Sequence, residues 1–351
     1  GYSLTGNHDQ AIATLNSYIL MDAEQDFTKD SDFESLVQIE QFKEIQNQQN
    51  NLTTEMPVKQ VYDWSIQGSH PESITYSDKM RSFLLGGIRD GKIWMIKEGK
   101  KPEVFAETSK NSWAVMGLDV SPDGRCLWVC TSSMTNFEGY NQNEQGFASV
   151  LKYDLKNGKL LDSQTVSGGH NFGDLIIDKK GNIYVSDGVA NKLYWVNNKN
   201  EKLEVFADLS EQVFNLQGLT FNQDESAIYL SDYIDGIYKL DLKSKQLKKL
   251  SITSDNILLK GIDGLYFKEN SLIGLHNGTK PNRVVRYTLS TDGNSITSKE
   301  TISQAGVLGE PTQGVFVDET FFYISNSPWA AYDADGNFSP QQESTIIGQS
   351  N

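Results

Sequence analysis

The feature that most constrains the fold of this chain is an internal repeat that occupies most of its 351 residues. Six copies of a short run, in which a small or polar pair precedes alternating apolar residues, recur along the chain. Each copy is followed by a turn signal and then by a second apolar run. The six opening runs cover residues 72–77, 116–121, 173–178, 217–222, 263–268 and 313–318.

The spacing of this repeat predicts a β-propeller. The second residues of successive runs lie 44, 57, 44, 46 and 50 residues apart, and a polar insertion over residues 132–146 accounts for the longest interval. Four strands in each unit of about 40–50 residues are the sequence signature of propeller blades. We therefore predict an all-β, six-bladed β-propeller over residues 57–351, which leaves no room for another domain.

The last unit has too few strands of its own. Its first two strands are expected near residues 313 and 321, and a third over 345–348. A strand near residues 58–64, ahead of the first unit, is predicted to supply the missing outer strand and to close the ring. A closed ring has no open sheet edge that needs a partner, so we expect a monomer.

Residues 1–56 do not share the repeat and are predicted to form a helical arm and linker. One helix is expected over roughly residues 10–23. Ser31-Asp-Phe-Glu34 has the form of a capping box, and apolar residues continue at helical spacing to Ile45. The polar run over 46–51 is interpreted as the linker. Two interpretations stay open: the arm packs against the main body, or it is a lid over a binding site.

Charge and hydropathy exclude two classes of partner. With 31 Lys and Arg against 46 Asp and Glu, the formal net charge is −15. A chain this acidic repels phosphate backbones, so nucleic acid is not an expected partner. No apolar run approaches the roughly 20 residues that span a bilayer, so no transmembrane segment is expected.

The cysteines and the first residue bear on the cellular compartment of the protein. Cys126 and Cys130 are four positions apart in a predicted strand, which places their Cα atoms roughly 13 Å apart. A disulfide needs about 7 Å or less, so both are expected to be free thiols. Because the sequence begins with Gly1, we expect a protein exported to the periplasm or the medium, with the cytoplasm as the alternative.

Propeller geometry gathers polar residues that are distant in the sequence. The first strand of each blade is innermost, and its start lies on the same face as the end of the second strand. The first-strand starts supply Glu72, Met116, Gly173, Gln217, Asp263 and Gln313. The second-strand ends supply Asp187, Asp232, His276, Asn277 and Asn326. Of the four histidines, His70, His170 and His276 fall at this face.

These residues suggest a cation site at the mouth of the central channel. Glu72 and Asp263 would repel each other and raise each other's pKa unless a cation lay between them. Oxygen ligands of this kind suit Ca²⁺, with Mg²⁺, Mn²⁺ or Zn²⁺ as other divalent candidates. The alternative is that polar side chains simply hydrate the rim. Phosphate-binding loops and a Gly-x-Ser-x-Gly nucleophile elbow are absent, which disfavours a serine hydrolase.

Over about residues 58–351 these motifs resemble the senescence-marker-protein/gluconolactonase/luciferin-regenerating-enzyme family of six-bladed propellers, with paraoxonase-like proteins as more distant relatives. His70-Pro-Glu72-Ser, Leu216-Gln217-Gly-Leu and Ile262-Asp263-Gly-Leu are similar to three family motifs. The resemblance implies that Glu72, Gln217 and Asp263 bind a metal ion.

Two positions depart from the family pattern. Gln217 stands where the family has Asn, and Gly173 of the Gly173-Asp174 pair also stands where the family has Asn. Asn171 and Asp174 are candidates to replace the missing ligand.

The resemblance implies a metal-dependent lactonase or related ester hydrolase. Its expected substrate is a small lactone or sugar-like ester, bound at the channel mouth. The cation would polarise the carbonyl and activate water, and Asp263, His70, His170 or His276 would act as general base. The alternative function is a non-catalytic propeller that binds a small ligand or a protein partner through the same face.

Overall fold

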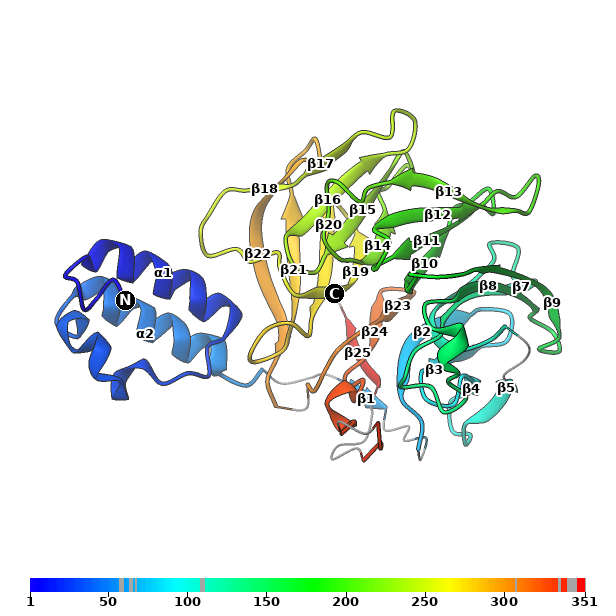
Figure 1. Ribbon diagram of the computed structural model, residues 1–351, viewed down its shortest axis with the longest axis horizontal. Helices are drawn as coiled ribbons and strands as arrows, with labels where there is room; N and C mark the ends of the chain where they lie inside the picture. The colour runs from blue at the N-terminus through cyan, green and yellow to red at the C-terminus, as the bar shows by residue number, and fades with distance from the viewer. Residues whose placement is uncertain are drawn as a thin grey trace.

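The computed structural model is a six-bladed β-propeller with a helical arm at its N-terminal end, which confirms the predicted fold class (Figure 1). The structure describes residues 1–56, 60–62, 66, 68–107, 111–306, 308–333, 336–339 and 346–350. Each blade is an antiparallel sheet whose strands follow one another from the channel outward.

The first three blades have four strands each. Blade 1 consists of β2 (Pro71–Ser77), β3 (Ser82–Gly87), β4 (Ile93–Ile96) and β5 (Glu103–Ala106). Blade 2 consists of β6 (Ala114–Val120), β7 (Cys126–Ser132), β8 (Ala148–Asp154) and β9 (Leu160–Val166). The polar insertion before β8 carries the short 3₁₀ helix η3 (Gln142–Glu144). Blade 3 consists of β10 (Phe172–Ile177), β11 (Ile183–Asp187), β12 (Lys192–Val196) and β13 (Leu203–Asp208).

The remaining blades complete the ring. Blade 4 consists of β14 (Leu216–Phe221), β15 (Ala227–Asp232), β16 (Gly236–Asp241) and β17 (Leu247–Lys249). Blade 5 consists of β19 (Ile262–Lys268), β20 (Ser271–His276), β21 (Arg283–Leu289) and β22 (Ser295–Gln304), with β18 (Ser251–Ile252) parallel to β22 at its edge. Blade 6 consists of β23 (Gly314–Val317), β24 (Thr320–Ile324), β25 (Ile346–Ser350) and β1 (Gln60–Tyr62), and the helix η4 (Trp329–Ala331) follows β24.

Blade 6 contains strands from opposite ends of the sequence. β1 is its outer strand and pairs antiparallel with β25, in the register Gln60↔Gly348 to Tyr62↔Ile346. The other residues of the predicted strand, 58–59 and 63–64, lie outside the described residues. The described pairing gives blade 6 four strands, although its segments come from residues almost 300 positions apart.

Buried apolar clusters join each blade to the next. Among the described residues, one such cluster spans each of the six junctions, including the junction between blades 6 and 1, where Ile74 meets Ile324. The alternation of apolar residues along each strand therefore supplies both faces of a blade with packing surface. Cys130 and Cys126 lie at the junction of blades 2 and 3 as free thiols, as predicted.

Glycines let the innermost strands approach closely around the axis. A Cβ atom on Gly218 would lie 2.4 Å from the carbonyl oxygen of Asp263 in the next blade. A Cβ atom on Gly264 would lie 2.2 Å from the carbonyl oxygen of Thr312. The Gly that follows Gln217 and Asp263 in the repeat is thus required by the packing of one blade on the next.

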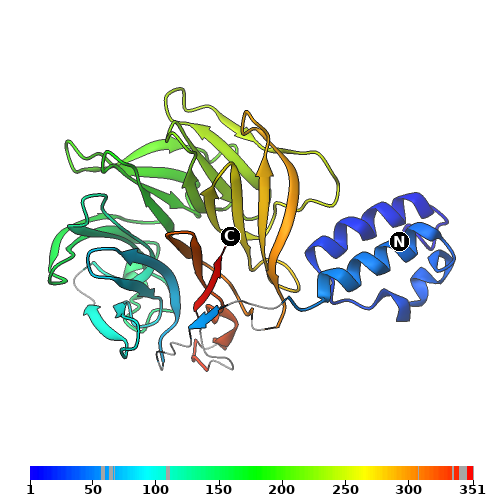
Figure 2. The same cartoon turned by 180° about the vertical axis from the view of Figure 1, so that it is seen from behind.

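The arm contains α1 (His8–Met21), η1 (Phe27–Lys29), η2 (Ser31–Leu36) and α2 (Glu40–Thr53). Its apolar residues form a core of their own, which includes Ile19, Leu36 and Phe42. Figure 2 shows the arm beside β22, on the outside of blade 5. No helix of the described ranges has the length and apolar character to cross a membrane.

Two predicted features of the arm are wrong. The capping-box segment forms the 3₁₀ helix η2, and α2 begins only at Glu40, because the chain is extended at Ile39 between the buried Leu36 and Phe42. The run over 46–51 is not a linker but part of α2. Its neighbours Ile45 and Leu52 are buried in the arm core, and Gln49 of this run donates hydrogen bonds from Nε2 to the carbonyls of Ala23 and Gln25 within the arm.

The arm is attached to blade 5 at the C-terminal ends of both helices. Arg283 donates a hydrogen bond from its guanidinium to the carbonyl of Leu20 at the end of α1. Gln304 donates from Nε2 to the carbonyls of Asn51 and Thr54 at the end of α2, at 2.7 and 2.6 Å. Arg283 and Gln304 are direct cross-strand neighbours in β21 and β22. One pair of side chains therefore caps two helices whose last carbonyls have no partner within the helix.

Candidate functional site

The predicted site residues lie where the innermost strands are irregular. In five blades the register between the first and second strands shifts at the start of the first strand. The residues within these shifts include Glu72, Asp174, Gln217 and Asp263. A bulge re-aims the side chain that it carries and commonly lies near functional sites. These four residues thus lie where the regular pairing of the first two strands is interrupted.

Glu72 is almost completely buried and is held by blade 6. Its Oε2 accepts hydrogen bonds from the Ser327 hydroxyl and, at 3.0 Å, from Trp329 Nε1. Burial raises the pKa of Glu72 well above its usual range, and the nearby charge of Asp263 adds to this increase. The electrostatic coupling shows that the fold brings Glu72 and Asp263 to the same region, as their positions in the repeat predicted.

His70 belongs to the network around Glu72 and does not face solvent. Its Nε2 lies 2.8 Å from Ser327 Oγ, and its Nδ1 lies 2.9 Å from the Tyr332 hydroxyl. Burial lowers the pKa of His70 to about 3, which keeps the ring neutral. This arrangement orients Ser327 toward Glu72 and gives His70 no access to a bound substrate.

Asp263 is half-buried at the channel mouth and is oriented by a chain of hydrogen bonds. Its Oδ2 accepts from Asn277 Nδ2 at 2.6 Å, and Asn277 Oδ1 accepts from the Tyr233 hydroxyl at 3.0 Å. Burial raises the pKa of Asp263 to about 7, and the charge of Glu310 contributes to the shift. A carboxyl group with this pKa can take up and release a proton near neutral pH.

Glu310 is a member of the site that the sequence did not predict. Its Oε2 accepts a hydrogen bond from the Trp329 amide at 2.9 Å, and burial raises its pKa. Its charge acts on both Glu72 and Asp263. The sequence feature that could have identified Glu310 is its position three residues before Gln313, in the loop that leads into the sixth repeat.

Gln217 and Gly173 are neighbours, so the two departures from the family pattern lie together. A Cβ atom on Gly173 would lie 3.3 Å from Gln217 Oε1. The longer Gln side chain thus extends toward the space that an Asn side chain at 173 would enter. Gln217 Nε2 donates to Asn215 Oδ1, which fixes the amide and leaves Oε1 directed at Gly173.

Asp174 lies inside the channel rather than at its mouth. It lines a cavity of about 170 Å³ together with Asp119, Tyr266 and Gln313. Its two carboxylate oxygens accept from the amides of Leu175 and Leu219, so it links blades 3 and 4. Burial raises its pKa to about 8.

Gln313 separates this inner cavity from the mouth. From blade 6 it donates through Nε2 to the carbonyl of Met116 in blade 2, at 2.8 Å, and to that of Gly173 in blade 3, at 3.3 Å. A single side chain therefore crosses the axis and forms the floor of the mouth.

The other predicted residues lie around blades 3 and 5. His170 is partly exposed, and its Nδ1 lies 2.7 Å from Asp187 Oδ2. The buried Asn171 Oδ1 has no hydrogen-bond partner among the described residues, so this oxygen is available as a metal ligand or a hydrogen-bond acceptor. His276 is buried with Nε2 2.6 Å from the Tyr287 hydroxyl, and burial lowers its pKa to about 3. Its ring therefore belongs to the interior of blade 5.

The candidate ligands have the oxygen atoms that a hard cation prefers, but they are not arranged as a metal site. Glu72, Gln217 and Asp263 offer carboxylate and amide oxygens, which suit Ca²⁺. However, the described part of the chain contains no group of three His, Cys, Asp or Glu side chains that could hold a metal ion. Glu72 Oε2 already accepts two hydrogen bonds. In this arrangement these residues do not form a complete metal site.

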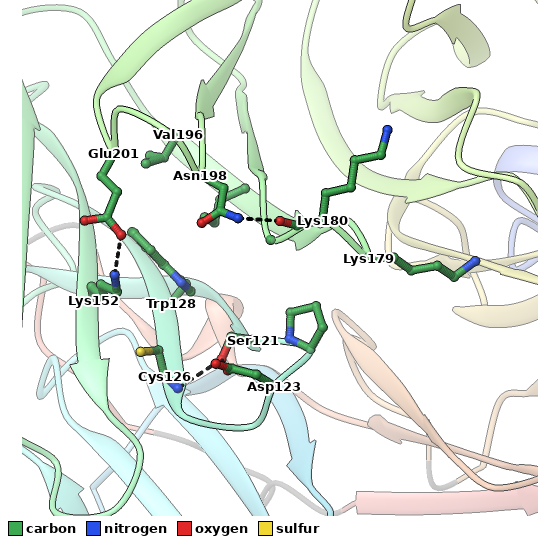
Figure 3. Close-up of a pocket in the computed structure, with 13 residues that line it drawn as sticks. Ser121, Asp123, Cys126, Trp128, Lys152, Lys179, Lys180, Val196, Asn198 and Glu201 are labelled. Atoms are coloured by element: carbon green, nitrogen blue, oxygen red, sulfur yellow. Dashed lines mark hydrogen bonds and ion pairs between the residues drawn. The ribbon is translucent and has the colours of Figure 1, made fainter.

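A second cavity, of about 230 Å³, lies at the opposite face between the hairpin turns of blades 2 and 3. Figure 3 shows Trp128 in this cavity, with Lys179 and Lys180 extending away from it. Lys152 pairs with Glu201 at 2.7 Å, and Lys179 pairs with Glu225 at 3.5 Å. These cations are therefore balanced by carboxylates, and the cavity is remote from the candidate site.

Comparison with known proteins supports the propeller fold but assigns the chain to no family. No protein-family model and no curated protein matches the chain. Among solved structures, the major allergen Mala s 1 of Malassezia sympodialis is similar with a TM-score of 0.63 and 15% identity, over 84% of this chain and 96% of that one. A gluconolactonase from Xanthomonas campestris has a TM-score of 0.56 and 13% identity, over 82% and 88%.

A sugar dehydrogenase is as similar to this chain in structure as the gluconolactonase is. The aldose sugar dehydrogenase of Streptomyces coelicolor, in its PQQ-bound form, has a TM-score of 0.57 and 12% identity, over 83% of this chain and 97% of that one. At such identities the comparisons show a shared fold alone. The resemblance found in the sequence motifs is thus supported at the level of a gluconolactonase-like propeller.

Proposed function

We propose that this protein is a lactonase-like hydrolase that acts on a small, polar, sugar-like lactone or ester at the channel mouth. The observation that carries the proposal is the geometry of Asp263. It is a half-buried carboxyl group oriented by Asn277, which is itself held by Tyr233. A general base whose orienting partner is in turn positioned by a third group is a recurrent arrangement in hydrolases.

The proposed reaction uses this carboxyl group twice. Asp263 removes a proton from a water molecule whose oxygen attacks the ester carbonyl carbon. The ring C–O bond then breaks, and the leaving oxygen takes the proton back from Asp263. The pKa of about 7 supports both steps, because the group exchanges protons readily near neutral pH.

The resemblance also implies a divalent cation, Ca²⁺ in the first place, held by Glu72, Gln217 and Asp263. Such a cation would polarise the carbonyl of the substrate. Binding it would require Glu72 to exchange its contacts with Ser327 and Trp329 for the metal, since its Oε2 accepts hydrogen bonds from both. Asn171, with its free buried oxygen, is the better candidate for an additional ligand, because Asp174 lies below Gln313.

A non-catalytic propeller that binds a small ligand is the second candidate. The described residues contain no group of three His, Cys, Asp or Glu side chains that could hold a metal ion, which favours it, since the family activity implied by the motifs depends on a metal. Export and a monomeric state remain predictions that accompany either function.

Hydrolysis of a lactone panel, followed by acid release, tests the proposal. We expect Asp263→Asn to lower kcat at least about a hundredfold, the usual contribution of a general base. Asp255→Asn, at an exposed position of the loop before β19, is the matched control and should retain activity. Assays with and without chelator, and Ca²⁺ titration by calorimetry, then decide the role of the cation.

The outcomes separate the two functions. An unchanged rate in Asp263→Asn contradicts the assignment of the base. Absence of hydrolysis across the panel, with retained binding of a lactone or polyol, favours the non-catalytic alternative. Activity that survives chelation and shows no Ca²⁺ binding at millimolar concentration would establish a metal-free reaction.

A further inference from the structure

A cleft of about 600 Å³ lies between the arm and the propeller. Glu24 of the arm forms one side. The opposite side comes from the loop over 277–282 between β20 and β21, and from Ala305, Leu308 and Glu310 ahead of β23. The cleft is thus built jointly by the helical and the β-rich parts of the molecule.

The cleft is continuous with the channel mouth. Asn277 and Glu310 both line it. Asn277 donates the hydrogen bond that orients Asp263, and Glu310 lies close enough for its charge to act on Asp263. A substrate whose reacting carbonyl reaches Asp263 would therefore extend its remaining part into this cleft.

The arm side of the cleft is fixed by backbone pairing. Asp22 and Lys280 form a parallel β-bridge, in which the Ala23 amide donates to the Lys280 carbonyl at 2.7 Å and the Lys280 amide donates to the Met21 carbonyl at 2.8 Å. Glu24 follows immediately, and its amide donates to Asp22 Oδ1 at 3.1 Å. The Arg283 contact to Leu20 holds the same end of α1. Backbone pairing with the propeller therefore presents Glu24 at the rim of the cleft.

The lining chemistry suits hydroxyl groups. Glu24 and Glu310 offer carboxylate oxygens, and Asn277 offers an amide, while Lys280 is the cation at the rim. Carboxylates accept strong hydrogen bonds from hydroxyl donors. An anionic substituent would meet two carboxylates, and a purely apolar one would leave them without partners.

We propose that this cleft binds the hydroxyl-bearing part of the substrate and that Glu24 of the arm determines specificity there. The inference rests on the proposed function, since it places the reacting carbonyl at Asp263. It assigns the arm a role in recognition, in which the arm completes a binding site that the propeller alone leaves open.

Steady-state kinetics with two lactones of the same ring size test the inference. D-Glucono-1,5-lactone carries hydroxyl groups, whereas δ-valerolactone carries none. Glu24→Lys is expected to raise KM for gluconolactone about tenfold, the loss of one hydrogen bond to a charged group, and Glu24→Gln, which keeps one acceptor oxygen, is expected to raise it less; kcat should not change in either variant. KM for δ-valerolactone should not change. Glu34→Lys, an exposed position of the arm that does not line the cleft, is the matched control.

Each result supports or overturns the inference. Unchanged KM for gluconolactone, or equal changes for both lactones, overturns it while the hydrolase assignment stands. If no lactone is hydrolysed, calorimetric binding of D-glucitol replaces the kinetics. Weaker binding in Glu24→Lys but not in Glu34→Lys then supports the cleft although the hydrolase proposal has failed. No binding of D-glucitol, or binding that Glu24→Lys does not change, overturns the inference.

Discussion

The propeller and the arm are stabilised by different kinds of contact. Each blade meets its neighbours through buried apolar clusters, and backbone pairing between β1 and β25 links the two ends of the propeller sequence. The arm has a core of its own. Among the described residues of the propeller, Leu258 packs against this core. Its attachment depends on hydrogen bonds from Arg283 and Gln304 and on the bridge to Lys280.

This difference implies two levels of stability in one chain. Apolar burial contributes free energy in proportion to area and is distributed around the whole ring, so the blades are expected to unfold together. A few hydrogen bonds contribute about 1 kcal/mol each, so the arm can separate from the ring at a much smaller cost.

The largest expected effect is a truncation in the closing blade. Ile347 of β25 is fully buried in the cluster between blades 5 and 6 and lies between Val61 and Tyr323 in the sheet. Ile347→Ala should lower the free energy of unfolding by about 2–5 kcal/mol, measured by chemical denaturation. Ile252→Ala, at an exposed edge position of blade 5, should have little effect. Equal effects of the two changes would contradict cooperative closure of the ring.

A second, smaller effect concerns a buried acid of the channel. Burial raises the pKa of Asp119 to about 6 from its ordinary value of 3.8. Between these pH values Asp119 ionises in the unfolded chain but stays protonated in the folded one, so its contribution to stability falls as pH rises from about 4 to 6 and is constant above. Asp119→Asn removes this dependence and retains an oxygen acceptor for Val120 and Thr75.

We therefore expect Asp119→Asn to be more stable than the native protein at pH 7, by up to about 3 kcal/mol, and equally stable near pH 4. Denaturation curves at a series of pH values measure this. Asp32→Asn, at an exposed position of the arm, is the control. If the two proteins differ by the same amount at every pH, the channel does not keep Asp119 protonated.

The ring could be predicted from the sequence because its interactions repeat. The same apolar alternation occurs blade after blade, and a Gly follows the first residue of the run in four of the six repeats, so the spacing indicated the architecture. The proximity of Glu72 and Asp263 followed from their equivalent positions at first-strand starts. These are local patterns that the symmetry of the ring places side by side.

Contacts outside the repeat could not be predicted in this way. Ser327 and Trp329 contact Glu72 from more than 250 residues away, in the segment that follows β24 and outside the repeated strands. The start of α2 depended on which apolar residues the arm core buries, and not on the capping-box signal. The arm is attached where the ends of its two helices meet Arg283 and Gln304 on one pair of strands. A periodic sequence pattern does not predict such a contact.

The smallest expected effect is the loss of one helix cap, and it tests the contrast most directly. Gln304→Leu removes both hydrogen bonds to the end of α2 while preserving the size of the side chain, so it should weaken attachment of the arm by about 1–2 kcal/mol. Amide hydrogen exchange should then be faster in α2 and unchanged in β15 and β24. Gln246→Leu, at an exposed turn of blade 4, controls for the substitution itself. Faster exchange in the blades as well would show that the arm and the ring form one cooperative unit, because a cap that served only the arm could not loosen strands of blades 4 and 6.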